Sequence, residues 1–298
     1  MTSAVSVKER LKRQAVEEGK TMQDKLITYG LERAIYRISV SNHADRFTLK
    51  GGIFLYALFD GKYTRATKDI DFLAQHIPND LNEMSKVFYD IFSISCDDAI
   101  IFDLNSLTVT SITEFKEYHG VNVSIMGYLD RTRVPVSIDI GFGDVIYPER
   151  VQMKFPVLLD MAVPEVYVYS LYSVIAEKFE AIVSLGFANS RYKDFYDIYA
   201  LACTYNLKGI ELRCAIIETF ARRHTNFCDI VAFEPDFVKD SIGQNRWNAF
   251  IKKKKAMLQI SFSEAMDLIK GLLEPVVISI KSETLFDKEW NKEIKQWM

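Results

Sequence analysis

Three consecutive segments in the middle of the chain alternate between apolar and polar residues. They span residues 106–115, 121–129 and 134–141, and they are rich in Val, Ile and Thr. Alternation of this kind, carried by β-branched residues, is typical of strands that bury one face and leave the other accessible. A β-sheet with one apolar side is therefore the structure around which the first half of the chain must fold.

Helical patterns precede and follow this sheet. Ahead of it, the sequence predicts a helical region over 6–38, a strand at 46–50, a helix at 53–59, a strand at 69–74 and a helix at 81–92. After Tyr147, five segments have helical periodicity: 170–185, 191–205, 210–223, 244–258 and 263–273. We therefore expect an α/β (α+β) protein, with a sheet-containing lobe over residues 1–160 and an all-helical lobe over residues 161–298.

Composition excludes several classes of protein. The 298 residues include 37 Lys and Arg against 40 Asp and Glu, so the net charge of −3 rules out a polyanion-binding surface that covers the whole chain. No apolar run approaches the roughly 18 residues of a membrane-spanning helix, and charges occupy the start, where a signal peptide needs apolar residues. The four cysteines form no C-x-x-C pair, which favours a reducing cytoplasm over a disulfide scaffold or structural zinc site.

Three aspartates on predicted strands are the first candidate site. Asp69 and Asp71 are two residues apart, so they share one face of a strand whose other face carries Ile70 and Phe72. Asp139 repeats this pattern in the apolar strand 134–141, where an Asp is costly unless it is paired or bound to metal. Such carboxylates suit Mg²⁺ (or Mn²⁺) with substrate phosphates, and three could hold two ions. A D-x-D that merely ends a strand in solvent is the alternative.

A glycine pair lies between a predicted strand and a predicted helix. Gly51 and Gly52 allow a tight turn there, and the free N–H groups at the start of a helix attract phosphate. Two glycines alone are more often a simple turn, so their weight comes from their position ahead of Asp69 and Asp71.

The helical half contains a lysine in an unusual place. Lys178 falls inside the apolar stripe of the predicted helix 170–185, four residues from both Val174 and Ile182. A lysine there either extends to water or reaches a buried anion. Asp194 and Asp197 follow, three residues apart and therefore neighbours on one helix face.

These motifs, taken together and in order, resemble a known family. L-K-G-G, a short helix and then R-x-T-x-D-I-D, followed about 100 residues later by E-K-x-x-A and R-x-K-D-x-x-D, are similar to the nucleotidyltransferase superfamily. Within it, the pattern resembles the AbiEii/AbiGii-type toxins of bacterial type IV toxin–antitoxin pairs. Family members usually carry Ser or Thr after the glycines, whereas this chain has Ile53, so phosphate contacts must rely on backbone N–H groups.

The resemblance implies a mixed-sheet nucleotidyltransferase lobe and Mg²⁺-dependent transfer of NMP from an NTP to a hydroxyl. It implies an RNA acceptor such as the tRNA 3′ end, or a protein hydroxyl, and an antitoxin partner. The metal ligands would be Asp69, Asp71 and Asp139, and catalysis would add Lys178, Asp194 and Asp197. The nucleotide-binding set would be Lys50, Gly51, Gly52, Arg65, Thr67 and Lys178.

Two functions from other classes stay open at this point. A catalytically silent nucleotide-binding module would keep the fold, and Ile53 favours it, whereas a metal-dependent nuclease would use the same three acids. The lysine run 252–255 is more consistent with a solvated helix face than with RNA binding, and the four histidines lie too far apart to suggest a metal site.

Overall fold

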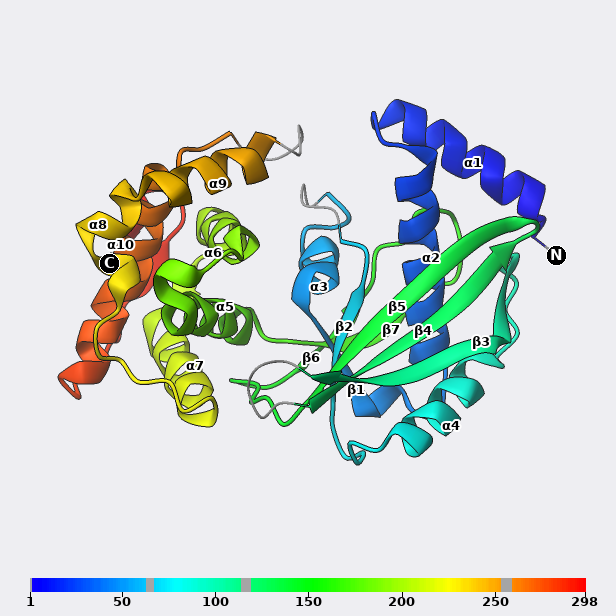
Figure 1. Cartoon of the computed structure of the whole chain (residues 1–298), viewed down its shortest axis with the longest axis horizontal. Helices are drawn as coiled ribbons and strands as arrows, with labels where there is room; N and C mark the ends of the chain where they lie inside the picture. Colours follow the sequence, from blue (N-terminus) through cyan, green and yellow to red (C-terminus); the bar gives the residue numbers. More distant parts are fainter. Residues whose placement is uncertain (1, 63–66, 114–118, 253–258) are drawn as a thin grey trace. The chain divides into compact units, whose positions relative to one another are not determined.

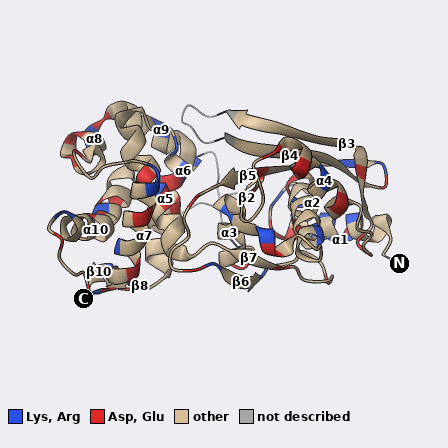
Figure 2. Cartoon of the chain, turned by 90° about the horizontal axis from the view of Figure 1, so that it is seen from below, with Lys and Arg blue, Asp and Glu red and all other residues tan. Residues whose placement is uncertain are grey.

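The computed structural model describes residues 2–62, 67–113, 119–252 and 259–298, and it comprises two compact units. Unit 1 consists of Met1–Gly143 and Arg150–Tyr169, and unit 2 consists of Asp144–Glu149 and Ser170–Met298. The chain therefore passes between the units three times. Acidic and basic residues are distributed along both units, as the nearly balanced composition leads one to expect (Figure 2).

Unit 1 is built on one mixed seven-stranded sheet in the order β3-β4-β5-β2-β1-β7-β6 (Figure 1). The strands are β1 Phe47–Lys50, β2 Ile70–Ala74, β3 Ile100–Thr113, β4 His119–Leu129, β5 Thr132–Phe142, β6 Val151–Lys154 and β7 Glu165–Val168. β2 runs parallel to β5, and β1 runs parallel to β7, whereas the other neighbours are antiparallel. The predicted mixed α/β fold is confirmed.

The sheet differs from the prediction at β3, β6 and β7. β3 begins at Ile100, not at residue 106, because a register shift between Asp103 and Thr108 interrupts its alternation and hides the first part of the strand. β6 and β7 have four residues each, too few to show a period, and β7 is defined mainly by its pairing with β1. Short strands of this kind depend on tertiary partners that one sequence does not show.

Helices α1 (Ala4–Glu17), α2 (Met22–Ser39), α3 (Gly51–Leu58) and α4 (Leu81–Phe92) complete unit 1. The predicted helical region 6–38 is two helices, because the chain turns at Gly19 with a φ of +62° and Thr21 then caps α2 in a capping box with Asp24. α2 and α4 lie against the long strands of the sheet (Figure 1). Contact with α2 is close, because a Cβ on Gly30 would lie 2.4 Å from Val134 Cγ1.

The two faces of β5 have opposite character, as predicted. Val134, Val136, Ile138 and Ile140 are buried on the face that packs against α2, whereas Asp139 lies between them on the other face and is partly exposed. β2 repeats this arrangement, with Ile70 and Phe72 buried. Burial of one side of the sheet thus fixes the register of the strands and directs the aspartates to the other side.

Unit 2 is mainly helical. Its helices are α5 Leu171–Leu185, α6 Tyr192–Thr204, α7 Gly209–Arg222, α8 Pro235–Lys239, α9 Ser241–Lys252 and α10 Phe262–Lys281. Aromatic side chains form much of its core, with Phe262 in contact with Tyr192, Phe195, Phe237 and Trp247. None of the helices in the described part of the chain combines the length and apolar character that crossing a bilayer requires.

Unit 2 corrects the prediction of an all-helical lobe in one respect. A small antiparallel sheet joins β8 (Leu207–Lys208), β9 (Glu289–Asn291) and β10 (Gln296–Trp297), and strands of two or three residues have no readable periodicity. The predicted helix 263–273 also continues to Lys281 through Pro275, because Val276 and Val277 are buried beyond it. The predicted end of the helix at 244–258 falls outside the described residues.

Candidate active site

The glycine turn is a place where only glycine fits. β1 ends at Lys50, and Gly51 begins α3 with a φ of +67°, in the left-handed region that favours glycine. A Cβ on Gly51 would lie 2.0 Å from Asp71 Oδ2, so the backbone here approaches the carboxylate directly. Ile53, the residue that follows the glycine pair, is buried and belongs to the core.

The aspartates of the D-x-D motif differ in their surroundings. Asp71 lies in β2, opposite Asp139 in β5 and opposite Lys50 in β1. Asp69 lies in the bend just before β2, where its Oδ1 accepts hydrogen bonds from Thr67 Oγ1 (3.4 Å) and the backbone N–H of Lys68 (3.3 Å). The structure thus places Asp71 opposite Asp139, whereas Asp69 lies one residue before β2, so the strand begins one residue later than predicted.

Neutral polar residues hold Asp139, and sequence reasoning did not select them. Asn122 of β4 lies opposite Asp139 and donates through Nδ2 to Asp139 Oδ1 (2.6 Å) and to Ser137 Oγ (2.9 Å). Its own Oδ1 accepts from Ser124 Oγ (2.8 Å). The alternation of Asn122 and Ser124 with buried valines was the available signal, because it places both on the face opposite the core.

Register therefore creates a polar row across four neighbouring strands, in the order Lys50, Asp71, Asp139 and Asn122. Tyr169 continues it beyond β7, with its hydroxyl 3.5 Å from Lys50 Nζ and its ring centroid 5.1 Å from the same atom. Tyr169 is another residue that the sequence alone did not indicate. Arg65, predicted to bind nucleotide, lies outside the described residues.

The acids offer the donor set that a hard divalent cation requires, which is carboxylate oxygen. Within the described residues, no three His, Cys, Asp or Glu side chains stand close enough to form a ready metal cluster. Mg²⁺ is, however, usually held by one or two carboxylates together with substrate phosphates and water. The opposed Asp71 and Asp139, with a side-chain-free glycine against Asp71, fit that kind of site.

Lys178 in unit 2 is part of a buried ionic network. Its Nζ lies 3.0 Å from Asp194 Oδ1 and 2.7 Å from Asp197 Oδ2, and both aspartate side chains are completely buried. Arg191, at the start of α6, contacts the second oxygen of Asp194 through Nε at 2.8 Å. Of the two alternatives for Lys178, the structure therefore shows contact with buried anions. The predicted face shared by Asp194 and Asp197 is confirmed.

A second ionic cluster of unit 2 surrounds Arg223. Its guanidinium contacts Asp144 (3.3 Å), Glu177 (3.5 Å) and Glu180 (2.9 Å). Burial alone would lower the pKa of Arg223, but the three carboxylates outweigh it and raise the pKa above its usual range. Glu177, which precedes Lys178 in the sequence motif, therefore supports the fold around α5 and α7.

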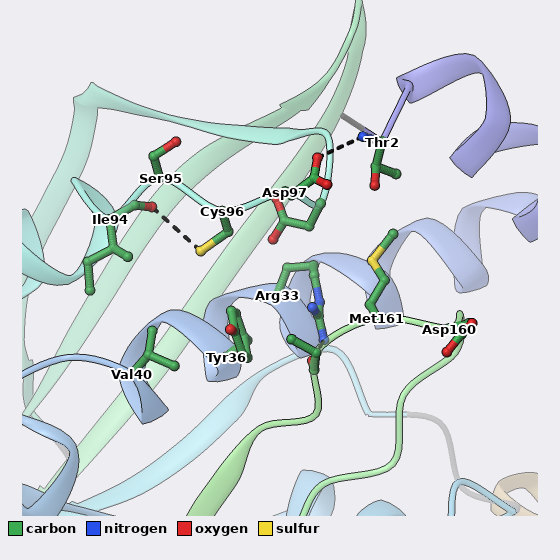
Figure 3. A pocket seen from close by; sticks show the side chains of 12 residues that line it. Thr2, Arg33, Tyr36, Val40, Ile94, Ser95, Cys96, Asp97, Asp160 and Met161 are labelled. Atoms are coloured by element: carbon green, nitrogen blue, oxygen red, sulfur yellow. Dashed lines mark hydrogen bonds between the residues drawn. The ribbon is translucent and has the colours of Figure 1, made fainter.

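A pocket of unit 1 lined by residues of α2 and of the loop after α4 is separate from these motifs. It has a volume of about 480 Å³, and it lies between α2 and the loop that follows α4 (Figure 3). Arg33 and Tyr36 face it from α2, and Asp97, which accepts a hydrogen bond from the backbone N–H of Thr2 (2.7 Å), lines it from the loop (Figure 3). None of the predicted site residues lines this pocket.

Comparison with protein families decides the class. The family model described as nucleotidyl transferase AbiEii toxin, type IV TA system, matches residues 33–268, which include both the glycine turn with its acids and the Lys178 network. This chain belongs to the AbiEii family. It is a nucleotidyltransferase, as the motifs predict. The search of curated proteins found no match.

Two solved structures from Helicobacter pylori are similar in outline. JHP933 has 14% sequence identity and a TM-score of 0.46, with 87% of this chain and 94% of that chain covered. A protein that carries a provisional nucleotidyltransferase name has 16% identity and a TM-score of 0.46, with 86% and 96% covered.

Proposed function

We propose that this AbiEii nucleotidyltransferase transfers a nucleoside monophosphate from an NTP to a hydroxyl of RNA, with the 3′ end of tRNA as the acceptor class. The observation that carries the proposal is the pairing of Asp71 with Asp139 beside a glycine turn that touches Asp71 directly. A phosphate chain needs both parts, since backbone N–H groups bind its oxygens and carboxylates hold the accompanying cation.

Each residue of unit 1 then has a defined task. The N–H groups of Gly51 and Gly52 at the start of α3 bind phosphate oxygens, and Lys50 adds positive charge at the adjoining strand end. Asp71 and Asp139, with Asp69 beside them, would hold Mg²⁺ (or Mn²⁺), which when bound neutralises charge on the phosphates. Thr67 orients Asp69 through its hydroxyl.

In the transfer itself, the acceptor oxygen attacks the α-phosphorus of the NTP. The bond from that phosphorus to the bridging oxygen breaks, and pyrophosphate leaves with the electron pair. Asn122 fixes one oxygen of Asp139, so the other oxygen is oriented to take the proton of the attacking hydroxyl. The pairing of β4 with β5 thus positions Asp139 for proton transfer, because it places Asn122 opposite this aspartate.

We include Lys178, Asp194 and Asp197 in the machinery because they belong to the second motif of the family. The two buried aspartates fix the position of the Lys178 ammonium group, and a fixed cation is suited to stabilising charge on a phosphate or a leaving pyrophosphate. Family membership also leads us to propose an antitoxin partner and a cytoplasmic location, where NTP and RNA are both available.

The test is incorporation of label from each of the four NTPs, with α-³²P, into RNA in the presence and absence of Mg²⁺. Asp71→Asn should lower the rate by roughly 100-fold or more, because a charged ligand is lost at the reacting phosphate. The variant should fold normally, since removing one of several clustered negative charges relieves repulsion. Asp287→Asn, an exposed Asp of unit 2, is the matched control and should keep full activity.

Other results would point to other functions. Shortening of the RNA in place of labelling indicates a metal-dependent nuclease. Binding of NTP without incorporation into any acceptor indicates a silent nucleotide-binding module. Calorimetry adds a further check, because NTP should bind more tightly with Mg²⁺ than without it if phosphates and carboxylates share the cation.

A further inference from the structure

A second pocket of unit 1 adjoins the candidate active site, and its lining comes mainly from β4 and β5, together with Ile27 of α2, the helix that packs against the apolar face. It has a volume of about 370 Å³, within the range of small-molecule sites. Its lining residues are Ile27, Lys68, Ser106, Ser124, Ile125, Met126, Pro135, Val136 and Ser137.

Strand register fixes the position of this pocket relative to the acids. Ser124 lies opposite Ser137, one same-face step from the Asn122–Asp139 pair along β4 and β5, and Met126 lies opposite Pro135, two such steps away. Successive same-face residues on a strand are roughly 6.5–7 Å apart. The pocket therefore begins one such step from Asp139.

The order of the strands indicates the side from which the acceptor hydroxyl approaches the acids. Across the sheet, the glycine turn follows β1, the D-x-D acids belong to β2, Asp139 belongs to β5, and the pocket extends over β5 and β4. Asp71 and Asp139 thus lie between the glycine turn and the pocket. In phosphoryl transfer the attacking and leaving oxygens are roughly in line on opposite sides of the phosphorus. If pyrophosphate leaves on the glycine side, the attacking group comes from the side of the pocket.

The chemistry of the lining suits a nucleoside. Ser137 Oγ accepts from Asn122, so its own hydrogen can be donated to a ligand, whereas Ser124 donates to Asn122 and can accept. Met126 and Pro135 supply apolar contact for a flat ring. Lys68 is exposed at the pocket and offers a cation for a phosphodiester.

We propose that this pocket holds the 3′-terminal nucleoside of the RNA acceptor and presents its ribose hydroxyl toward Asp139. This inference rests on the proposed nucleotidyl transfer. One hydroxyl of the ribose reaches the serine pair while its vicinal neighbour is presented to Asp139, the base occupies the apolar part, and the preceding phosphate meets Lys68. A tyrosine or serine side chain of a protein acceptor has one hydroxyl and no phosphate, so it cannot satisfy both the serine pair and Lys68. The lining therefore favours RNA as the acceptor.

The experiment changes one lining residue that makes no side-chain bond to the Asp139 network. Met126→Trp fills the pocket, and Met126→Ala removes its apolar wall with less risk to the fold. Ser111→Trp is the matched control, an exposed β3 residue whose register partner Val121 places it on the opposite face of the sheet. Transfer is measured on an RNA hairpin with an unpaired 3′ CCA end, and on the same hairpin with an abasic terminal residue.

For the wild-type protein, the abasic end should raise the KM for RNA by roughly tenfold, because the pocket loses the base that it binds. Met126→Trp should raise the KM for the intact hairpin by a similar factor and should no longer distinguish the two hairpins. Met126→Ala should show the same trend with a smaller factor. Both Met126 variants should keep the wild-type kcat and the wild-type KM for NTP. The control variant Ser111→Trp should match the wild-type protein in all of these constants.

Three results would overturn the inference. In the first, the Met126 variants raise the KM for NTP in place of the KM for RNA, which means that the pocket binds the base of the NTP. In the second, neither KM changes in these variants. In the third, the wild-type protein labels protein side chains and no RNA. In the third case nucleotidyl transfer itself stands. If the wild-type protein neither binds Mg²⁺ with NTP nor forms labelled product, the proposed function fails first, and the inference falls with it.

Discussion

Replacing Lys178 by methionine tests the buried network of unit 2 most directly. The substitution keeps most of the apolar volume of the side chain and removes its charge. Asp194 and Asp197, both with fully buried side chains, then lose the ammonium group that lies 3.0 and 2.7 Å from their oxygens. Asp194 keeps Arg191, but that guanidinium is about half exposed and offers a weaker substitute.

The expected cost follows from burial. Removing one partner of a buried ion pair typically costs about 3–5 kcal/mol, because the remaining charge stays desolvated without compensation. In a unit of this size that loss corresponds to a fall of about 10 °C or more in melting temperature. Replacing the two aspartates as well, to give Lys178→Met/Asp194→Asn/Asp197→Asn, removes the stranded charges and should recover most of the stability.

The assay is urea or thermal unfolding of the single and triple variants, with NTP incorporation measured in parallel. We expect the single variant to be unstable and inactive, and the triple variant to be stable and still inactive. The inactive but stable triple variant separates a role in transfer from a role in folding. A single variant as stable as the wild-type protein would refute the buried network, and a fully active triple variant would remove Lys178 from the machinery.

Three further predictions concern unit 1. Gly51→Ala should lower the free energy of unfolding in urea by about 1–3 kcal/mol and should abolish incorporation, because the φ of +67° and the 2.0 Å approach to Asp71 exclude a Cβ. Normal activity of this variant would contradict the requirement for glycine at the turn. Ile53→Ser should lower the free energy of unfolding by about 2–4 kcal/mol, since it puts a small polar side chain into the core. An unchanged free energy of unfolding would mean that Ile53 does not belong to the core. Burial raises the pKa of Glu32 to about 7 despite Arg33, so the folded state holds a proton that the unfolded state releases above about pH 4.5. Stability should therefore fall by about 3 kcal/mol from pH 4.5 to pH 7, and Glu32→Gln should flatten that dependence in unfolding experiments at several pH values.

The parts of the fold that the sequence predicted are those with long, regular burial patterns. β5 alternates over its whole length because α2 covers one face, and α4 and α5 present continuous apolar stripes, so periodicity alone located them. β8, β9 and β10 could not be found in this way, since they exist only through their pairing with one another. The break between α1 and α2 depended on one glycine inside an otherwise continuous helical pattern.

The same difference between local pattern and tertiary pairing separates the site residues that the sequence predicted from those that it did not. Asp71, Asp139 and the glycine pair could be selected because chemistry and local spacing suffice to single them out. Asn122 and Tyr169 could not, because their roles arise from register: Asn122 lies 17 residues from Asp139, and Tyr169 lies 119 residues from Lys50. The double ion pair of Lys178 was one of two readings of the helix pattern, and only packing decides between them.

The return of the chain to unit 1 through Arg150–Tyr169 has a practical consequence for fragments. β7 is the parallel neighbour of β1, and β6 closes the sheet beyond it. A protein truncated at Gly143 would leave one side of β1 without hydrogen-bond partners, directly beside Lys50 and the glycine turn. Such an open sheet edge is a template for association with other chains. The sheet-containing half is therefore expected to aggregate when it is expressed alone up to Gly143, and its soluble expression requires β6 and β7, supplied in cis or as a separate peptide.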